Sequence, residues 1–326
     1  MIITKVPLRI SFFGGGTDYK PFFDEYGGSV LSTTIDKYVY TSVRRCPPYF
    51  DYHTQIKYAI TESVRKTEDV IHPLVRNCML FTGMHNLNVI YDADLPARSG
   101  LGSSSSFAVG LLQAFSSMQG KYISKEQLAK DSIYVERELC LENGGWQDQI
   151  AAAYGGFNRI DFCSTGFDVK PLVISNEKKF DLQNHLLMFF TGLSRNSFDI
   201  ANSQVKNIDS KTSELLEMKS LVDDAEKILT SQTDISEFGK LLDHAWILKR
   251  GLTKNISTDL IDEIYSKAKN AGALGGKLLG AGGGGFMIIF AEPDCHKSII
   301  STLDDLINVP VVFENNGAQV LYYVPE

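Results

Sequence analysis

The sequence lacks the features that mark membrane and secreted proteins. No apolar run among its 326 residues approaches the ~18 residues of a membrane span, and its start lacks the charged-then-apolar layout of a signal peptide. The five cysteines are scattered, without metal-ligand spacing, and the six histidines show no zinc-ligand spacing. Such dispersed cysteines are typical of reduced thiols in the cytosol. We therefore expect a cytoplasmic protein that does not bind a membrane.

Basic residues are also too few, and too dispersed, for a nucleic-acid-binding surface. The chain has 32 basic and 39 acidic residues, a net charge of −7, and no Lys/Arg run stands out. An anionic ligand would therefore need a local site. The hydrophobic fraction of 44% is ordinary for a globular protein and is sufficient for a core without disulfides. The composition leaves the oligomeric state open between monomer and homodimer.

The pattern of apolar residues predicts a two-domain α+β protein. Strand patterns cover residues 29–43, 87–92, 185–191, 286–291, 309–313 and 320–324. Helical spacing covers residues 104–119, 210–229, 235–249 and 258–271. A capping box at Ser124 predicts a further helix that stops near Gly144. The composition shifts near residues 165–179, so we expect domains of residues 1–170 and 171–326.

The strongest functional signal is a glycine- and serine-rich segment, Pro96-Ala97-Arg98-Ser99-Gly100-Leu101-Gly102-Ser103-Ser104-Ser105-Ser106. It lies between a predicted strand and a predicted helix. Glycines allow close backbone approach to a ligand, and a helix N-terminus offers unpaired N–H groups to an anion. Serine hydroxyls can contact phosphate oxygens or a hydrated Mg²⁺. The segment therefore suits a nucleoside triphosphate, although a flexible Gly/Ser loop is the alternative interpretation.

Two familiar nucleotide motifs do not fit the sequence. No Gly-x-x-x-x-Gly-Lys-Ser/Thr motif occurs, which argues against a P-loop NTPase. The run from Gly280 to Gly285 matches Gly-x-Gly-x-x-Gly in spelling, but it precedes a predicted strand, whereas a dinucleotide fingerprint follows a strand and opens a helix. We therefore reject a Rossmann domain and predict a tight turn between a helix and a strand.

A third glycine-rich segment lies near the N-terminus. A strand pattern there ends in Arg9-Ile10-Ser11-Phe12-Phe13-Gly14-Gly15-Gly16-Thr17-Asp18. Because carboxylates accept hydrogen bonds from sugar hydroxyls, this turn could present Thr17 and Asp18 to a polyol. A polar hairpin turn is the alternative.

These three segments, in this order, resemble the GHMP kinases, which include galactokinases, homoserine kinases and mevalonate kinases. The specific stretch is Pro96-x-x-x-Gly100-Leu101-Gly102-Ser103-Ser104-Ser105, and the run from Lys277 to Gly285 resembles the third motif of the family. The resemblance covers essentially the whole chain. It implies a two-domain α+β fold, with an N-terminal mixed α/β domain and a C-terminal ferredoxin-like α+β domain.

Within this superfamily, the first motif resembles that of the D-glycero-D-manno-heptose 7-phosphate kinases, because galactose and mevalonate kinases carry Gly-Glu-His there. The stretches Phe190–Arg195 and Trp246-x-x-Lys249-Arg250 are also similar. The resemblance implies transfer of the γ-phosphoryl group of ATP to the anomeric hydroxyl. The product would be a heptose 1,7-bisphosphate on the route to a nucleotide-activated heptose for surface polysaccharide.

The resemblance also implies roles for individual residues. Asp148 would be the general base and Arg9 would orient it or stabilise charge on the transferred group. Ser104 and Glu136 would hold Mg²⁺, whose preferred ligands are oxygens. The expected ATP-binding residues are Pro96, Ser99, Gly100, Leu101, Gly102, Ser103, Ser104 and Ser105. The expected acceptor-binding residues are Gly15, Gly16, Thr17, Asp18, Arg195, Arg250, Gly282 and Gly283. Among them Arg195 and Arg250, with Lys249 behind them, are the candidates to bind the 7-phosphate of the acceptor.

Several alternatives remain at this stage. Taken alone, Glu136 is an ordinary exposed helix residue, Asp148 a turn or cap residue, and each arginine a solvated surface charge. L-Fucokinase-like enzymes share part of the pattern, so a kinase of a free sugar is an alternative. A non-catalytic sugar or nucleotide sensor with the same fold is another. The first motif disfavours a mevalonate-type kinase.

Overall fold

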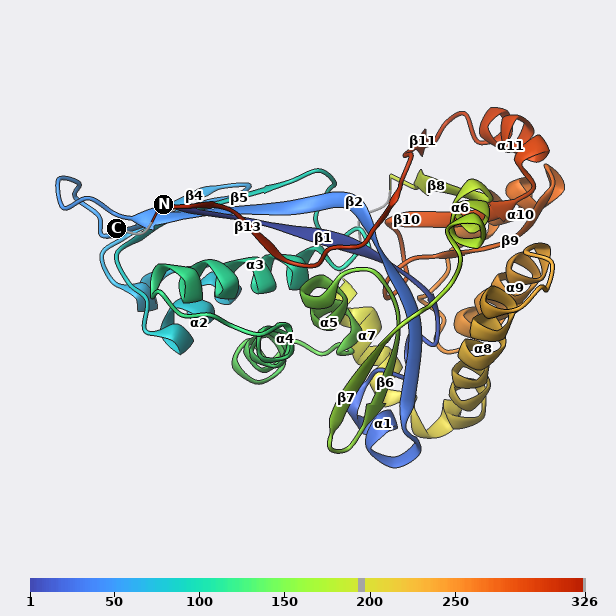
Figure 1. The fold of residues 1–326 in the computed structure, drawn as a ribbon, viewed down its shortest axis with the longest axis horizontal. Helices are drawn as coiled ribbons and strands as arrows, with labels where there is room; N and C mark the ends of the chain where they lie inside the picture. Colours follow the sequence, from blue (N-terminus) through green and yellow to red (C-terminus); the bar gives the residue numbers. More distant parts are fainter. Residues whose placement is uncertain (193–196, 325–326) are drawn as a thin grey trace.

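The computed structural model describes residues 1–192 and 197–324, which form two β-sheets covered by helices (Figure 1). The strands are β1 (Ile2–Phe13), β2 (Gly28–Arg45), β3 (Thr54–Lys57), β4 (Thr61–Val64), β5 (Leu87–Ala93), β6 (Phe157–Cys163), β7 (Gly166–Pro171), β8 (Leu186–Phe190), β9 (Ala273–Leu278), β10 (Phe286–Ala291), β11 (Ile307–Asn308), β12 (Phe313–Glu314) and β13 (Gln319–Tyr323). The helices are α1 (Lys20–Tyr26), α2 (Pro73–Thr82), α3 (Ser103–Met118), α4 (Lys125–Tyr134), α5 (Gln147–Tyr154), α6 (Asn176–Asn184), α7 (Ser197–Lys206), α8 (Thr212–Thr230), α9 (Ser236–Arg250), α10 (Asp259–Asn270) and α11 (His296–Thr302). No helix in the described ranges is long and apolar enough to cross a membrane.

The larger sheet is built on two long antiparallel strands, β1 and β2. Both are rich in β-branched and aromatic residues, which fit a pleated surface that is buried on one face. Their pairing runs from Ile2 opposite Val43 to Phe13 opposite Leu31. The described strands of this sheet follow the order β13-β1-β2-β5-β3-β4, and β6 and β12 pair with other parts of β2. The glycine turn after Phe13 therefore leaves the sheet at the end of β1, next to the central strand β2.

Helix α3 packs against this sheet and carries the predicted nucleotide segment at its start. Its apolar residues face the strands β1 and β2, and Figure 1 shows it beside α2 and α4 on one face of the long strands. Gly110 makes the close approach possible, because a Cβ atom there would lie 3.0 Å from Thr41 Oγ1. The predicted strand–loop–helix order of residues 87–119 is thereby confirmed.

The smaller sheet follows the strand order β11-β8-β10-β9 and packs against α9 (Figure 1). The glycine run before β10 joins two antiparallel strands, so the predicted turn between a helix and a strand was wrong. The sequence of β9 is Ala-Leu-Gly-Gly-Lys-Leu, which has weak strand propensity. Tertiary packing forms this strand instead: at Gly275, a Cβ atom would lie 2.0 Å from the carbonyl oxygen of Gly239 in α9.

The region from Ser124 to Asp148 differs from its predicted form. The Ser124 cap is present, because its Oγ accepts a hydrogen bond from Gln127 N at 3.1 Å. The helix then changes to a π-helical turn over Val135–Leu139 and ends at Cys140, before the predicted stop. A new helix, α5, places Asp148 in its first turn. Sequence analysis missed α5 because its eight residues are too short for a periodic signal.

The C-terminal segment returns to the larger sheet. The predicted strand over residues 309–313 is divided, because β11 pairs with β8 in the smaller sheet whereas β12 pairs with β2 in the larger one. Strand β13 then pairs with β1, beside which it lies in Figure 1. The predicted domain boundary between residues 170 and 171 would assign β12 and β13 to the second domain. Both strands nevertheless belong to the first sheet.

Candidate active site

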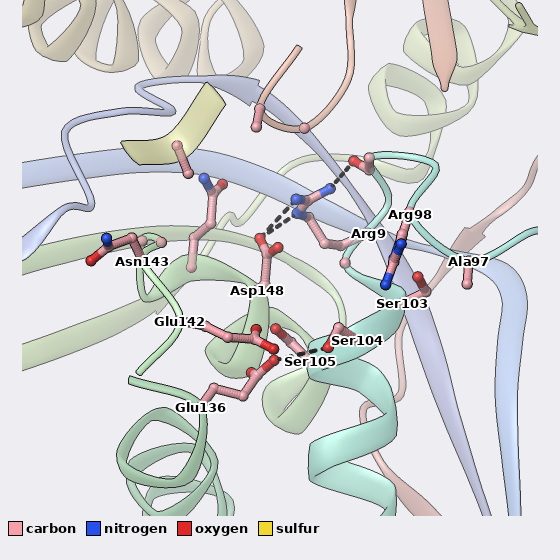
Figure 2. A pocket seen from close by; sticks show the side chains of 18 of the residues that line it. Arg9, Ala97, Arg98, Ser103, Ser104, Ser105, Glu136, Glu142, Asn143 and Asp148 are labelled. Atoms are coloured by element: carbon pink, nitrogen blue, oxygen red, sulfur yellow. Dashed lines mark hydrogen bonds and ion pairs between the residues drawn. The ribbon is translucent and has the colours of Figure 1, made fainter. Parts of the chain in front are cut away.

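A cavity of about 730 Å³ lies where the glycine-rich segments meet. Its walls come from five segments (Figure 2). They are the first-motif turn (residues 14–18), the start of α3, the segment before α5, the end of α9 and the loop after β9. This volume falls in the range of small-molecule sites. The cavity therefore collects segments that are far apart in the sequence.

Two of the glycine-rich loops form one wall by backbone contact. A Cβ atom at Gly100 would lie 2.3 Å from the carbonyl oxygen of Leu279, and one at Gly280 would lie 2.4 Å from Gly100 Cα. A Cβ atom at Gly285 would similarly lie 2.2 Å from the carbonyl oxygen of Ser99. Only glycine permits this approach, so the loop before α3 is fixed against the smaller sheet.

The start of α3 faces the cavity. Gly102 precedes the helix with φ +78°, and Ser106 N is the first amide to bond back, to the carbonyl of Gly102. The amides of Ser103, Ser104 and Ser105 therefore remain available to an anion. Of the expected ATP-binding residues, Gly100, Gly102, Ser103, Ser104 and Ser105 line the cavity.

The other expected ATP-binding residues do not line the cavity. They are Pro96, Ser99 and Leu101. The carbonyl of Leu101 accepts a hydrogen bond from Arg9 N at 3.0 Å, and that of Ser99 accepts one from Phe286 N at 3.1 Å. Ser99 and Leu101 are therefore placed to shape the loop.

The expected metal ligands meet on one side of the cavity. Ser104 Oγ donates a hydrogen bond to Glu136 Oε1 at 3.2 Å, and Gln149 Nε2 donates to Glu136 Oε2 at 2.5 Å. Glu136 is buried on the π-helical turn and forms no ion pair with a described residue. Glu142 directs its carboxyl group toward this pair (Figure 2), and burial, with Glu136 nearby, raises the pKa of Glu142. Sequence reasoning missed Glu142, since a lone glutamate carries no spacing signal.

This donor set fits a magnesium ion that a nucleotide helps to hold. It offers a hydroxyl and carboxylates, which are the hard oxygen ligands that Mg²⁺ prefers. Within residues 1–192 and 197–324, no group of three or more His, Cys, Asp or Glu could hold a metal on its own. Protein sites for Mg²⁺ commonly supply one or two carboxylates and leave the rest to phosphates and water.

Arg9 and Asp148 form an ion pair at the centre of the cavity (Figure 2). Arg9 Nε and Nη2 both bond to Asp148 Oδ1, at 2.8 and 2.7 Å, and Arg9 Nη1 donates to the carbonyl of Gly100 at 2.7 Å. No described residue donates a hydrogen bond to Asp148 Oδ2, and the Asp148 side chain is 25% exposed. The pair thus holds Asp148 in place and leaves one oxygen open to a ligand.

The first-motif turn contributes to the cavity differently from expectation. Gly15, Gly16 and Asp18 line it. Asp18 is buried, which raises its pKa, and its oxygens accept hydrogen bonds from Gly16 N and Gln147 N at 2.9 and 3.2 Å. Asp18 therefore also ties this turn to the start of α5.

Thr17 does not reach the cavity, which corrects its expected contact with the acceptor. Its side chain is fully buried, and its hydroxyl donates to the carbonyls of Gly14 and Ser29 at 2.8 and 2.9 Å. The amide of Ser29 also donates to this hydroxyl. Thr17 closes the turn internally.

Other expected acceptor-binding residues also lie away from the cavity. Arg250 bonds to Asp262 at 2.9 Å and stacks on Trp246. At Gly282 a Cβ atom would lie 2.7 Å from Ile256 Cα, and Gly283 N donates to the carbonyl of Ile256, so both glycines pack against backbone. Arg195 lies outside the described residues. The structure therefore does not bring Arg250, Gly282 or Gly283 to the site.

Two buried lysines line the cavity, which the expected Arg250 does not reach. Lys249 is 5% exposed and Lys277 is 2% exposed. Burial lowers the pKa of Lys249 to about 8 and lowers that of Lys277 well below its usual range. From the sequence, Lys249 was expected only as support for Arg195 and Arg250 at the acceptor phosphate, and Lys277 only as part of a motif. Burial of a lysine inside a glycine-rich strand has no local sequence signal.

Comparison with known proteins agrees with the fold. Residues 66–156 match the GHMP kinases N terminal domain, and residues 224–303 match GHMP kinases C terminal. A D-glycero-alpha-D-manno-heptose 7-phosphate kinase from Campylobacter jejuni is 30% identical over 317 residues, which cover 93% of each chain. A bifunctional fucokinase/GDP-fucose pyrophosphorylase from Arabidopsis thaliana is 27% identical over 90% of this chain and 30% of the plant protein.

Solved structures share the whole architecture. A D-glycero-D-manno-heptose 1-phosphate kinase from Bacteroides thetaiotaomicron matches with a TM-score of 0.80 and 24% identity, over 99% of this chain and 100% of that one. The predicted two-domain α+β GHMP kinase fold is thereby confirmed. GHMP kinases use ATP as their phosphoryl donor. The chain belongs to the GHMP kinase family and is a phosphotransferase of the sugar-kinase type.

Proposed function

We propose that this kinase transfers the γ-phosphoryl group of ATP to the anomeric hydroxyl of D-glycero-D-manno-heptose 7-phosphate. The observation that carries the chemistry is the Arg9–Asp148 pair, which leaves Asp148 Oδ2 open to the cavity and opposite the start of α3. The choice of sugar rests on the 30% identity to the Campylobacter jejuni heptose 7-phosphate kinase. A heptose 1,7-bisphosphate would then serve the synthesis of a nucleotide-activated heptose for surface polysaccharide.

Each reacting group has a place in this scheme. The amides at the start of α3 bind the phosphate chain of ATP, where the helix dipole favours negative charge. Ser104 and Glu136, with Glu142 beside them, would hold Mg²⁺, which supplies charge neutralisation to the β- and γ-phosphates. Asp148 Oδ2 accepts the proton of the anomeric hydroxyl while the oxygen of that hydroxyl forms a bond to the γ-phosphorus. The bond from this phosphorus to the bridging oxygen breaks, and ADP leaves.

Arg9 acts on both reactants in this scheme. Its guanidinium orients Asp148 through Oδ1, and its positive charge lies beside the group that is transferred. It also holds the carbonyl of Gly100, which couples the base to the loop that binds ATP. Gly15, Gly16 and Asp18 lie where they can contact the sugar.

A panel of acceptors tests the assignment. ADP release is measured with ATP and Mg²⁺ against D-glycero-D-manno-heptose 7-phosphate, free heptose, L-fucose, galactose and mevalonate. We expect turnover with the heptose 7-phosphate to exceed that with every other acceptor by at least about 100-fold in kcat/KM, a difference of nearly 3 kcal/mol in transition-state binding. Turnover confined to L-fucose would favour a fucokinase, an alternative that the similarity to the plant fucokinase supports. Nucleotide binding without ADP release from any acceptor would favour a non-catalytic sensor.

A further inference from the structure

Two buried lysines face the cavity without an acidic partner. The tip of Lys249 donates to the carbonyls of Leu278 and Gly280, at 3.3 and 2.5 Å. The tip of Lys277 donates to the carbonyl of Phe12 at 2.7 Å. Neither ammonium group forms an ion pair with a carboxylate in the part of the chain that the structure describes. Both are held by backbone carbonyls alone.

The surrounding charges do not compensate these two cations. The charged neighbours of Lys249 are Arg9, Asp18 and Asp148, and Lys277 lies close to Lys249 and Arg9. Arg9 and Asp148 neutralise each other as an ion pair. Asp18 remains as one carboxyl group for two ammonium groups, and its oxygens already accept backbone amides. When both lysines are protonated, this wall of the cavity therefore carries at least one positive charge in excess.

Burial of an uncompensated ammonium group costs roughly several kcal/mol. A ligand that supplies the opposite charge offsets this cost. We propose that Lys249 and Lys277 form a phosphate-binding subsite in the wall of the cavity. An ammonium group has three N–H donors. Lys249 uses two of them and Lys277 uses one, which leaves three for phosphate oxygens.

This subsite deepens the proposed function and rests on it for the identity of the phosphate. A phosphate monoester on the acceptor and the phosphoryl group in transfer present the same oxygens, so either could occupy the subsite. The arginine expected to bind the acceptor phosphate does not line the cavity, because Arg250 is paired with Asp262. The two lysines are therefore available for a role that the arginine does not fill.

The first test measures binding of inorganic phosphate to the full chain, with ADP and Mg²⁺ present so that the nucleotide loop is occupied. The variants are Lys249→Met and Lys277→Met, which remove the charge and keep most of the side-chain length. The matched control is Lys240→Met, on the same helix as Lys249, because Lys240 is exposed and pairs with Glu237. We expect phosphate affinity to fall at least about 10-fold in both cavity variants and to remain unchanged in the control.

Kinetics then identify which phosphate occupies the subsite. If it is the acceptor phosphate, Lys249→Met raises KM for the heptose 7-phosphate at least about 10-fold and leaves KM for free heptose unchanged. If it is the phosphoryl group in transfer, kcat falls by the same factor with both acceptors. Unfolding curves of both variants are measured first to establish that each is folded, and one folded variant is sufficient for the test.

Two results would overturn the proposal. One is a wild-type protein that does not bind inorganic phosphate under these conditions. The other is phosphate affinity, KM and kcat in the folded variants equal to those of Lys240→Met. Failure of the proposed function has a different signature: phosphate binding that depends on both lysines, in a protein that does not phosphorylate the heptose 7-phosphate.

Discussion

The two carboxylate oxygens of Asp148 differ in their hydrogen-bond partners. Two nitrogens of Arg9 bind Oδ1, whereas Oδ2 accepts no hydrogen bond from a described residue. Asp148 also lies in the first turn of α5, at the positive end of the helix dipole. This arrangement gives one oxygen a positioning role and leaves the other to accept a proton.

The variant Asp148→Asn tests that role. Its amide oxygen can still accept from Arg9, but the side chain cannot take up a proton, so we expect kcat to fall by about 100-fold to 10,000-fold. Binding of ATP should remain within about two-fold, because Asp148 does not belong to the nucleotide loop. Steady-state ADP release and calorimetric titration with nucleotide measure the two effects. Asp24→Asn, on the surface and paired with Lys20, is the control; full turnover in Asp148→Asn would reject the general base.

The lowered pKa of Lys249 predicts that the free energy of unfolding depends on pH. Burial lowers its pKa from 10.5 to about 8, and the charged groups around it are Arg9, Asp18, Asp148 and Lys277. Between pH 8 and 10.5, Lys249 is therefore protonated in the unfolded chain but not in the folded chain. Its contribution to the free energy of unfolding consequently rises with pH. Relative to Lys249→Met, the free energy of unfolding of the wild type should rise by up to roughly 3 kcal/mol across this interval.

Urea unfolding of both proteins, in phosphate-free buffer at about pH 7 and about pH 9.5, measures this change. Other titrating groups largely cancel in the difference between the two proteins. A difference that is the same at both pH values would show that Lys249 is not held in a desolvated site.

At the scale of elements, contact between the two glycine-rich loops joins the nucleotide segment to the smaller sheet. Gly100 has φ +85° and lies against the carbonyl of Leu279, whereas Gly120 has φ +68° with open space around it. Gly120→Ala should therefore cost only the strain of a left-handed residue, about 1 kcal/mol. Gly100→Ala adds a backbone clash and should cost roughly 3 kcal/mol or more, with a higher KM for ATP.

Thermal and urea unfolding of these two variants, with KM for ATP, provide the measurement. The pair separates conformational strain, which both variants share, from loop contact, which only Gly100 makes. Equal destabilisation of the two variants would show that the loop contact does not hold the nucleotide segment.

Elements with a local sequence signal could be predicted, and those that depend on tertiary contact could not. The apolar spacing of α3 and the cap at Ser124 are local patterns, and both are present. Strand β9 contains two glycines and forms because it pairs with β10 and packs on α9. The two-part route of residues 307–314 depends on which sheet edge is free, which no local pattern encodes.

The same distinction applies to the site. Ser104, Glu136, Arg9 and Asp148 were expected from motifs, and the structure brings them to one cavity. The expected role of Thr17 followed from residue type alone, and burial of its hydroxyl removes it from the cavity. Lysines and glutamates outside a motif read as surface charges, so only the folded chain reveals the positions of the lysine pair and of Glu142.

At the scale of the whole molecule, the cavity depends on both sheets. The larger sheet supplies Arg9 and supports α3, while the smaller sheet supplies Lys277 and the loop that packs on Gly100. The chain joins the two sheets more than once, since its C-terminal strands return to β1 and β2. A substrate that contacts both sheets is enclosed by walls that neither sheet provides alone.

Identification of the product tests the central proposal most directly. The protein is incubated with ATP, Mg²⁺ and D-glycero-D-manno-heptose 7-phosphate, and the product is analysed by ³¹P NMR and mass spectrometry. We predict a bisphosphate in which the new phosphorus couples to the anomeric proton, while the original 7-phosphate remains. A new phosphorus coupled to a proton elsewhere on the sugar, or no phosphorylated product from this acceptor, would contradict the proposal.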